Sequence, residues 1–174
     1  MADDSVVPEP PWLSARRGRR SSRPPLTREA IVDAALRVLD REGLDGVSMR
    51  RVAEELGTGA GSLYWHVANK DELIGLVFDR VAGEVRLPPP DPARWEEQYK
   101  EVAREARRVL AAHRDIARWS LGRIPMGPNT LRLTEWQLAL LRAAGIPSTV
   151  AALAGDLFGL YVAAHAFEET LGLG

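Results

Sequence analysis

From Thr27 onward, apolar residues recur along the chain with the period of an α-helix. The first periodic stretch can be capped at its start by Thr27 and ended by Gly43. Its apolar positions are Ile31, Ala34, Ala35, Val38 and Leu39. This spacing places the apolar residues on one face and predicts an amphipathic helix.

Three shorter stretches follow before residue 86. The first is predicted to be a helix from Met49 to Leu56, capped by Ser48, with Val47 and Val52 placed as a hydrophobic staple. After a glycine-bearing turn, a short helix is expected over SLYWHV, residues 62–67. A fourth helix is expected to start at Asn69 because Asn69 and Glu72 have cap spacing.

The proline-rich run LPPPDP, residues 87–92, interrupts the helical pattern. Proline lacks an amide donor and disfavours helix in the residue before it, so we expect a domain boundary here. Beyond it, helices are predicted from Trp95 to Leu110, from Thr130 to Ala144 and from Ser148 to about Thr170. The last has apolar residues nearly all round.

These patterns predict an all-α fold in three parts. Residues 1–26 form a disordered basic arm, residues 27–86 form a three-helix head with its following helix, and residues 92–174 form a helical body. Hydrophobic residues make up 45 % and charged residues 27 % of the chain, which are ordinary values for a globular protein. The sequence has no stretch of 18 apolar residues, which argues against a membrane-spanning helix. No signal sequence is apparent either, so a cytoplasmic protein is expected.

The arm is the one strongly basic part of a chain whose formal net charge is −1. Between Ser14 and Arg28 there are six arginines and no acidic residue. We single out four of them as candidate DNA contacts: Arg16, Arg17, Arg19 and Arg20. The segment is either a solvated tail or an arm that contacts phosphates or the minor groove of DNA.

The head carries a more specific signal than its helix spacing. The segment REAIVDAALRVLDREGLDGVSMRRVAEELGTGAGSLYWHVANKDELI resembles the DNA-binding domain of the TetR family of transcriptional regulators, most distinctively in LYWHV and NK. The resemblance implies a helix-turn-helix over about residues 48–67 that binds double-stranded operator DNA, with no enzymatic activity and no cofactor.

The resemblance also implies roles for individual residues. Arg50 matches a base-contacting position, where a guanidinium can grip guanine. The matches to phosphate-contacting positions are Ser48, Tyr64 and Lys70. Ser62, Trp65 and His66 are expected to lie at the DNA, whereas Leu63 and Val67 are assigned to the core. The alternatives are a packing role for Tyr64 and Trp65, and a merely solvated position for Arg50 and Lys70.

Two features limit what the head can do alone. Gly59 and Ala60 stand where recognition helices of the family often begin with serine or lysine, so few side chains can read bases there. From Arg23 to Lys70 there are seven basic and seven acidic residues, a net charge of zero. Specificity is therefore expected from Arg50, Ser62, Tyr64 and Trp65, and affinity from the arm.

The body is similar to the C-terminal domain of tetracycline repressors, as seen in HRDIARWSLGRIP, GPNTLRLTEWQLALLRAAGIP and the final apolar helix. This similarity implies a small-molecule inducer and a homodimer formed through the C-terminal helices. Candidate ligand-binding residues are Trp95, Tyr99, Val102, Ala106, Trp119, Met126, Trp136 and Phe158. Each could instead be plain core, since aromatic residues at helical spacing usually are.

Departures from the tetracycline repressors argue for another inducer. Seven residues after His113, where those repressors place a magnesium-binding histidine, this chain has Ser120. Polar positions that grip the drug correspond to Val102 and Trp136. We therefore expect a small apolar inducer and no metal. The family's dimer bundle uses a further helix beyond Gly174, so we expect the chain to be incomplete at this end rather than its interface to be reduced.

Two other classes of protein are alternatives to a DNA-binding regulator. A protein-kinase catalytic loop is suggested by His113, Arg114 and Asp115, but Ser120 stands where its asparagine belongs, and no phosphate-binding loop, HExxH or GxSxG occurs. With no cysteine, thiol chemistry is excluded as well. The remaining alternative is a helical adaptor that binds a protein partner and no DNA.

The arm hypothesis predicts a change in salt dependence. Deletion of residues 1–22 should weaken DNA binding and flatten the slope of log affinity against log salt concentration, because fewer counterions are released. The slope is measured by titrating a labelled DNA duplex at several salt concentrations. Equal slopes for the full and shortened chains would exclude a role for the arm.

Overall fold

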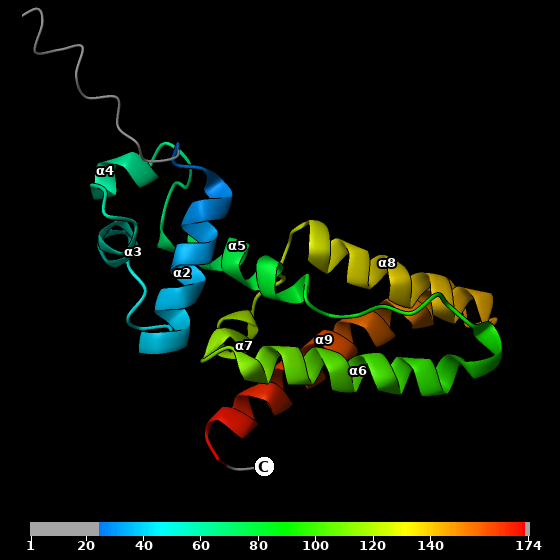
Figure 1. Ribbon diagram of the computed structural model, residues 1–174. Helices are drawn as coiled ribbons and strands as arrows, with labels where there is room; N and C mark the ends of the chain where they lie inside the picture. The colour runs from blue at the N-terminus through cyan, green and yellow to red at the C-terminus, as the bar shows by residue number, and fades with distance from the viewer. Residues whose placement is uncertain (1–24, 173–174) are drawn as a thin grey trace, which may run out of the picture.

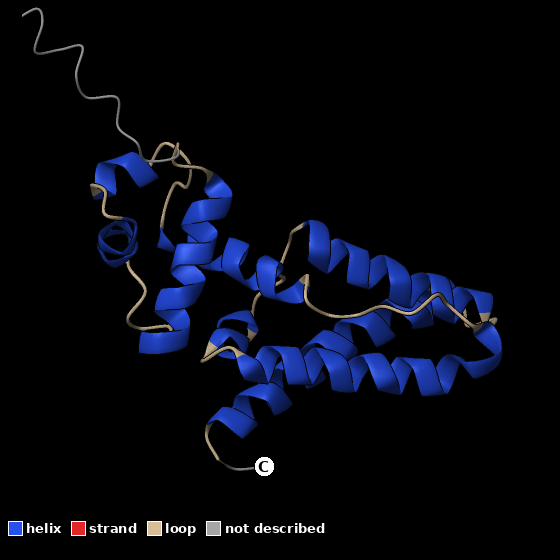
Figure 2. Ribbon diagram, viewed as in Figure 1, coloured by secondary structure: helices blue, strands red, loops and turns tan. Residues whose placement is uncertain are grey.

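A computed structural model describes residues 25–172, and every regular element in that range is helical (Figures 1 and 2). The elements are α2 (Arg28–Glu42), α3 (Met49–Leu56), α4 (Ala60–Leu63), α5 (Lys70–Ala82), η1 (Pro92–Arg94), α6 (Trp95–Ala112), α7 (Ile116–Ser120), α8 (Pro128–Ala143) and α9 (Ser148–Thr170). The all-α prediction is confirmed. Most of the predicted arm, including its four candidate arginines, lies outside the described residues.

The three expected helix caps are present in the head. The Thr27 hydroxyl accepts a hydrogen bond from Ala30 N at 3.1 Å, and the Ser48 hydroxyl accepts one from Arg51 N at 3.1 Å. The Asn69 side chain accepts from the amide of the third helical residue, at 2.9 Å. Each bond satisfies an amide that has no partner inside its helix. These side chains therefore set where α2, α3 and α5 begin.

The third helix of the head differs from its prediction. Residues 62–67 were expected to be helical, but α4 spans Ala60–Leu63 and the chain then turns through Tyr64 to His66. Gly59 has extended backbone, and its carbonyl accepts from Ser62 N at 3.0 Å, so the helix begins two residues early. The turn forms because the Leu63 carbonyl accepts from both His66 N and Val67 N. Residues 64–66 therefore belong to a turn and not to the helix.

Ion pairs hold α3 against α2. Glu55 contacts Arg41 at 2.6 Å and Arg37 at 3.3 Å, and Arg51 contacts Glu42 at 2.7 Å. Hydrogen bonds from Arg41, and then from Arg37, lower the pKa of the Glu55 carboxyl. In these pairs, arginines of the head are neutralised by glutamates of the head. The zero net charge counted from the sequence therefore corresponds to ion pairs in the structure.

The body is a layer of α6, α8 and α9, with α7 at the end nearest the head (Figure 1). One side of α9 is buried against α6, α7 and α8, whereas large apolar side chains cover its other side. Those exposed residues are Val150, Leu153, Leu157, Leu160 and Tyr161. By length and composition α9 could cross a membrane, but one such helix is weak evidence. Its packing against three helices buries 28 % of its most apolar stretch.

Helix α5 links the head to the body, because it packs against α2 in the head and against α6, α7 and α8 in the body. Its buried Asp79 caps α8: the carboxylate accepts from Thr130 N at 2.9 Å, from Asn129 N at 3.0 Å and from Asn129 Nδ2 at 3.1 Å. Gly127 is required beside it, since a Cβ there would lie 2.3 Å from Asp79 Cγ.

Replacement of Asp79 by alanine should destabilise the protein by about 2–4 kcal/mol, because buried amides at the start of α8 lose a charged acceptor. Denaturant unfolding followed by circular dichroism measures the change. Asp33→Ala is the matched control, since Asp33 is half-exposed and only 3.5 Å from Arg80 in a surface pair. Equal losses in the two variants would contradict the role given to Asp79.

Candidate nucleic-acid interface

The exposed side of α3 presents two of the candidate DNA contacts. Arg50 has 87 % of its side chain exposed and lies 3.3 Å from Glu54 on the next turn. The Ser48 hydroxyl accepts the capping hydrogen bond described above, and its own proton stays available to donate. Arg50 can therefore exchange a weak surface ion pair for a base edge, and Ser48 can donate to a phosphate while it caps α3.

The N-terminal turn of α4 is almost bare of side chains. A Cβ built on Gly59 or Gly61 would have no neighbour within 4 Å, and neither residue has positive φ. The internal packing of the head thus does not demand these glycines. Ser62 is exposed, and its oxygen accepts from the Thr58 hydroxyl at 3.4 Å. Few groups on α4 itself are able to contact bases.

The turn after α4 brings aromatic side chains to the surface. Trp65 is 88 % exposed and Tyr64 is 55 % exposed, whereas Leu63 and Val67 on either side of them are buried. The assignment of Leu63 and Val67 to the core is confirmed. Because Tyr64 and Trp65 are so exposed, they contribute little to packing of the head. Their exposure leaves a phenol and an indole available to phosphates or to thymine methyl groups.

His66 and Lys70 have partners within the head. The His66 carbonyl accepts from Arg28 Nε at 3.1 Å, which ties the turn to the start of α2. Lys70 is exposed at the first position of α5, and its Nζ lies 3.4 Å from the Leu44 carbonyl. An ammonium in the first turn opposes the helix dipole. A phosphate bound to Lys70 would offset this cost.

The candidate ligand-binding residues do not surround one cavity. Val102, Ala106 and Trp136 are buried, and Trp136 donates from Nε1 to the Pro88 carbonyl at 2.6 Å. Trp95 is partly buried against the core, whereas Met126 is 71 % exposed in the loop before α8. These positions remain predictions, and neither of the two hollows described below is lined by all of them.

Trp119 lies at the junction of head and body. Its indole donates to the Asp71 carboxylate at 3.0 Å, and its ring lies 5.7 Å from that of Phe78. Both partners are on α5, so this side chain fastens α7 to the linking helix.

Two candidate residues meet in an open groove between α6 and α9. The rings of Tyr99 and Phe158 pack edge to face, with centroids 5.2 Å apart, and the groove beside them holds about 730 Å³. The Tyr99 hydroxyl donates to the Ala154 carbonyl at 2.9 Å, and burial raises the pKa of Tyr99 to about 12. The rest of the lining is almost wholly apolar and includes Leu157 and Leu160. The groove therefore suits an apolar occupant.

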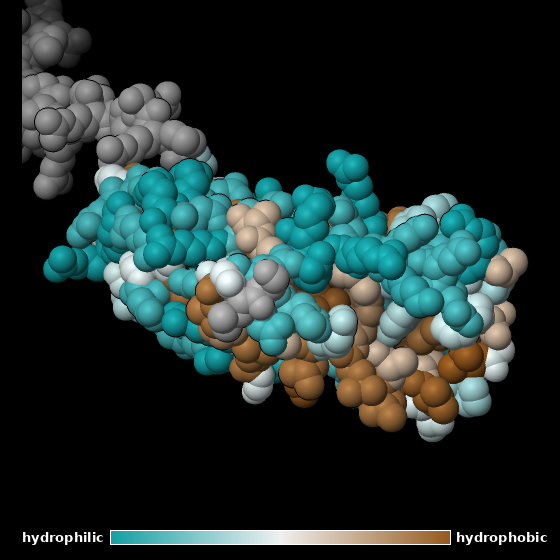
Figure 3. Space-filling model, turned by 90° about the horizontal axis from the view of Figure 1, so that it is seen from below, coloured by the Kyte–Doolittle hydropathy of each residue, from teal (hydrophilic) through white to brown (hydrophobic). Residues whose placement is uncertain are grey.

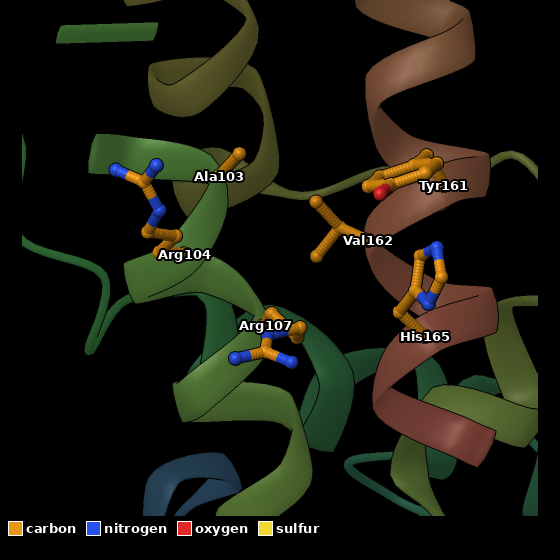
Figure 4. A pocket seen from close by; sticks show the side chains of 6 residues that line it. All are labelled: Ala103, Arg104, Arg107, Tyr161, Val162 and His165. Carbon is orange, nitrogen blue, oxygen red and sulfur yellow. The ribbon is translucent and has the colours of Figure 1, made fainter. Parts of the chain in front are cut away.

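Sequence reasoning missed a second hollow, of about 330 Å³, which adjoins this groove (Figure 4). Its lining residues are Ala103, Arg104 and Arg107 from α6 and Tyr161, Val162 and His165 from α9. Tyr161 and His165 stack edge to face, and Arg107 pairs with Glu169. The i, i+3 spacing of Arg104 and Arg107 was the only available signal, and it does not reveal that α9 lies opposite.

Ser120, at the position of the tetracycline repressors' metal-binding histidine, has a structural role. Ser120 is buried, and its hydroxyl donates to the Ala117 carbonyl at 2.9 Å. Among the described residues, no three His, Cys, Asp or Glu side chains are grouped so that they could hold a metal ion.

A helix-turn-helix head joined to a helical body is typical of a class of DNA-binding regulators. Comparison with known families assigns both parts of the chain to this class. Residues 31–77 match the family described as bacterial regulatory proteins, tetR family, and residues 87–173 match the tetracyclin repressor-like C-terminal domain. The chain belongs to the TetR family of transcriptional regulators.

Two relatives that are similar in sequence are HTH-type transcriptional regulators. An HTH-type transcriptional regulator of Saccharopolyspora erythraea is 38 % identical over 160 residues, which cover 92 % of this chain and 67 % of that protein. The HTH-type transcriptional repressor DrrR1 of Streptomyces coeruleorubidus is 38 % identical over 149 residues, 82 % of this chain and 54 % of the repressor. The chain thus spans about half to two thirds of the length of these relatives.

ActR of Streptomyces coelicolor is similar in structure. Its ligand-free crystal structure matches with a TM-score of 0.82 and 50 % identity, over 86 % of this chain and 72 % of ActR. Structures of ActR in complex with actinorhodin and with (S)-DNPA match with TM-scores of 0.80 and 0.81.

Proposed function

We propose that this chain is a ligand-responsive repressor that binds a palindromic operator as a homodimer and is released by a small apolar inducer. The observation that carries the proposal is the contrast within residues 48–67: the apolar positions are buried, while Arg50, Tyr64 and Trp65 project into solvent. A rigid framework with exposed hydrogen-bonding and aromatic side chains is suited to the major groove. A helical adaptor would not require this set.

The contacts divide by chemistry. Arg50 reads a base edge, since its guanidinium matches the two acceptors of guanine. Ser48, Tyr64 and Lys70 contact phosphates and set the register of the head on the duplex. Ser62, Trp65 and His66 lie beside them, where an indole can cover a thymine methyl group. Because the head is electrically neutral, the arginines of the arm supply much of the affinity.

The exposed side of α9 is the proposed dimer surface. Figure 3 shows apolar side chains gathered on the body, while the head is covered mainly by polar ones. The large apolar residues of α9 that contribute to this surface are each more than half exposed. An apolar patch of this kind marks an interaction site. Two copies joined here present two heads, as a palindromic operator requires.

The inducer is proposed to be apolar and free of bound metal. Support comes from the apolar lining between α6 and α9 and from Ser120, whose hydroxyl is occupied. ActR, which binds actinorhodin and (S)-DNPA, shows that a similar body can take organic ligands. An inducer that prefers a dimer with displaced heads lowers operator affinity by its differential binding. DrrR1 supports repression as the mode of regulation.

The DNA-binding proposal is tested with a duplex selected from a random library by the chain itself. The selected sequences should contain an inverted repeat. Arg50→Ala should then weaken binding by at least about tenfold in a gel shift, because a bidentate base contact is lost in each head. Helicity should not change, since the side chain is solvent-exposed.

Arg142→Ala is the matched control, because it removes an exposed arginine from the last turn of α8, far along the body from the head. Its affinity should equal that of the original chain. If no sequence is enriched, or if both variants bind equally, the chain is not an operator-binding repressor that uses Arg50.

The dimer proposal predicts that Leu157→Glu combined with Leu160→Glu raises the dissociation constant of the dimer by on the order of 100-fold, since leucines that the dimer would bury are replaced by charges. Analytical ultracentrifugation measures it. Leu131→Glu on α8 is the control, because this leucine is also more than half exposed but lies off the α9 surface. A dimer that resists the double change would place the interface elsewhere.

A further inference from the structure

The groove and the second hollow between α6 and α9 adjoin and differ in chemistry. Ala103 of α6 and Tyr161 of α9 line both of them. The groove is almost wholly apolar, and in it Tyr99 and Phe158 pack edge to face, whereas two arginines of α6 line the hollow. With about 730 Å³, the groove has the size that small organic ligands occupy. Together the two form one site with an apolar end and a cationic end.

Arg104 is the cation of this site that has no carboxylate partner. It is exposed, and no acidic side chain in the described part of the chain pairs with it. Glu101, three residues before it on α6, lies 3.6 Å from Arg94 instead. Lys100 and Arg108 stand four residues before and after Arg104, and like charges at this spacing repel each other on a helix. An anion bound at Arg104 would offset that repulsion.

Arg107 also has donors that are open to a ligand. It pairs with Glu169 through one nitrogen of its guanidinium, a group that carries five N–H donors. The neighbouring acid on α9, Glu168, lies 3.2 Å from Nδ1 of His165. Both carboxylates of α9 at this end therefore have nitrogen partners, and neither of them pairs with Arg104.

Tyr161 lies where the apolar and cationic ends meet. Figure 4 shows its hydroxyl and the side chain of Val162 directed toward α6, while the Arg104 guanidinium extends away from α9. Exposed side chains change rotamer within nanoseconds, so Arg104 can turn over the hollow when a ligand binds. The Tyr99 hydroxyl already donates to the Ala154 carbonyl at 2.9 Å. The donors that are open to a ligand thus lie at the arginine end.

We propose that the inducer is an organic acid, whose apolar part lies along Tyr99 and Phe158 and whose carboxylate binds Arg104 and Arg107. Arginine suits this role because its planar guanidinium can bind a carboxylate through two parallel hydrogen bonds. The inference deepens the proposed function. That the acid acts as an inducer rests on the proposed function, whereas its binding at this site does not.

Binding is tested without DNA, with 4-biphenylacetate and its uncharged counterpart 4-biphenylacetamide as probes. Both carry the same apolar body, and the acid is ionised at pH 7. Isothermal titration calorimetry on the full chain should give a dissociation constant roughly tenfold lower for the acid, because only the acid forms charge-assisted hydrogen bonds with both arginines. Arg104→Gln should remove most of this preference and leave the affinity for the amide unchanged.

Arg108→Gln is the matched control, since Arg108 is also an exposed arginine of α6 but pairs with Glu105 at 2.8 Å and does not line the hollow. This variant should keep the full preference for the acid. Equal affinity of the original chain for acid and amide, binding of neither probe, or an equal loss of preference in Arg104→Gln and Arg108→Gln would overturn the proposal.

The apolar end is tested with Tyr161→Ala. This variant should weaken the binding of both probes to a similar degree, because both lose contact with the same ring. The side chain is 62 % exposed, so the fold does not depend on it, and circular dichroism checks this. Unchanged affinity for both probes would show that the ligand does not lie in the groove.

Release from DNA is then measured with the duplex selected from the random library. At saturation, 4-biphenylacetate should release the duplex from the original chain and from Arg108→Gln, and Arg104→Gln should need roughly tenfold more of it. No release at saturation, or equal release from the two variants, would refute the inducing role. If the acid binds as expected but no duplex is selected, the proposed function fails while the acid-binding site stands.

Discussion

Burial of α5 on both sides is the constraint on which the rest of the structure depends. The helix carries seven buried residues within thirteen, and these face α2 in the head and α6, α7 and α8 in the body. A helix that completes two cores cannot turn without disturbing both, because protein interiors are close-packed. Asp79 adds a polar condition, since its carboxylate must stay at the start of α8. Head and body therefore move together or repack together.

The contacts that residues 113–118 make with the head are polar and charged. Apolar packing along α5 fixes the linking helix, but α2 also meets the body at its far end, where Asp40, Arg41 and Leu44 accept or donate hydrogen bonds to residues 113–115. Such contacts depend on geometry more than apolar packing does. They are suited to setting the position of the head without contributing a second large core.

The side chains on the proposed DNA-facing surface are those that the core of the head does not bury. Leu63 and Val67 point inward, and the turn between them forces Tyr64 and Trp65 outward. Gly59 and Gly61 at the start of α4 provide no side chain that could contact DNA. The candidate DNA contacts therefore come mainly from α3 and from the turn after α4. On the body, α9 contributes to both proposed interactions. Its exposed apolar side is the proposed dimer surface, and the groove beside it is the proposed site for an apolar ligand.

The sequence by itself determined the longer helices and the family, whereas the short α7 was not predicted. Caps at Thr27, Ser48 and Asn69, prolines after residue 86 and the apolar period are local signals, because each acts within a few residues. The short α4 was misjudged, since its end depends on two amides sharing the Leu63 carbonyl. Among the candidate site residues, the exposed ones of the head were predictable because their apolar neighbours had to be buried.

Only the tertiary structure decided which distant residues meet. Tyr99 reaches Phe158, Asp79 caps a helix 50 residues away, and His113 is set between Asp40 and Glu84. No spacing rule predicts these pairs, because they depend on the angle at which helices cross and not on the period within one helix. The same holds for the scattered tryptophans of the body: the sequence marks them as apolar anchors, and packing determines that Trp119 fastens α7 to α5 while Trp136 binds the Pro88 carbonyl.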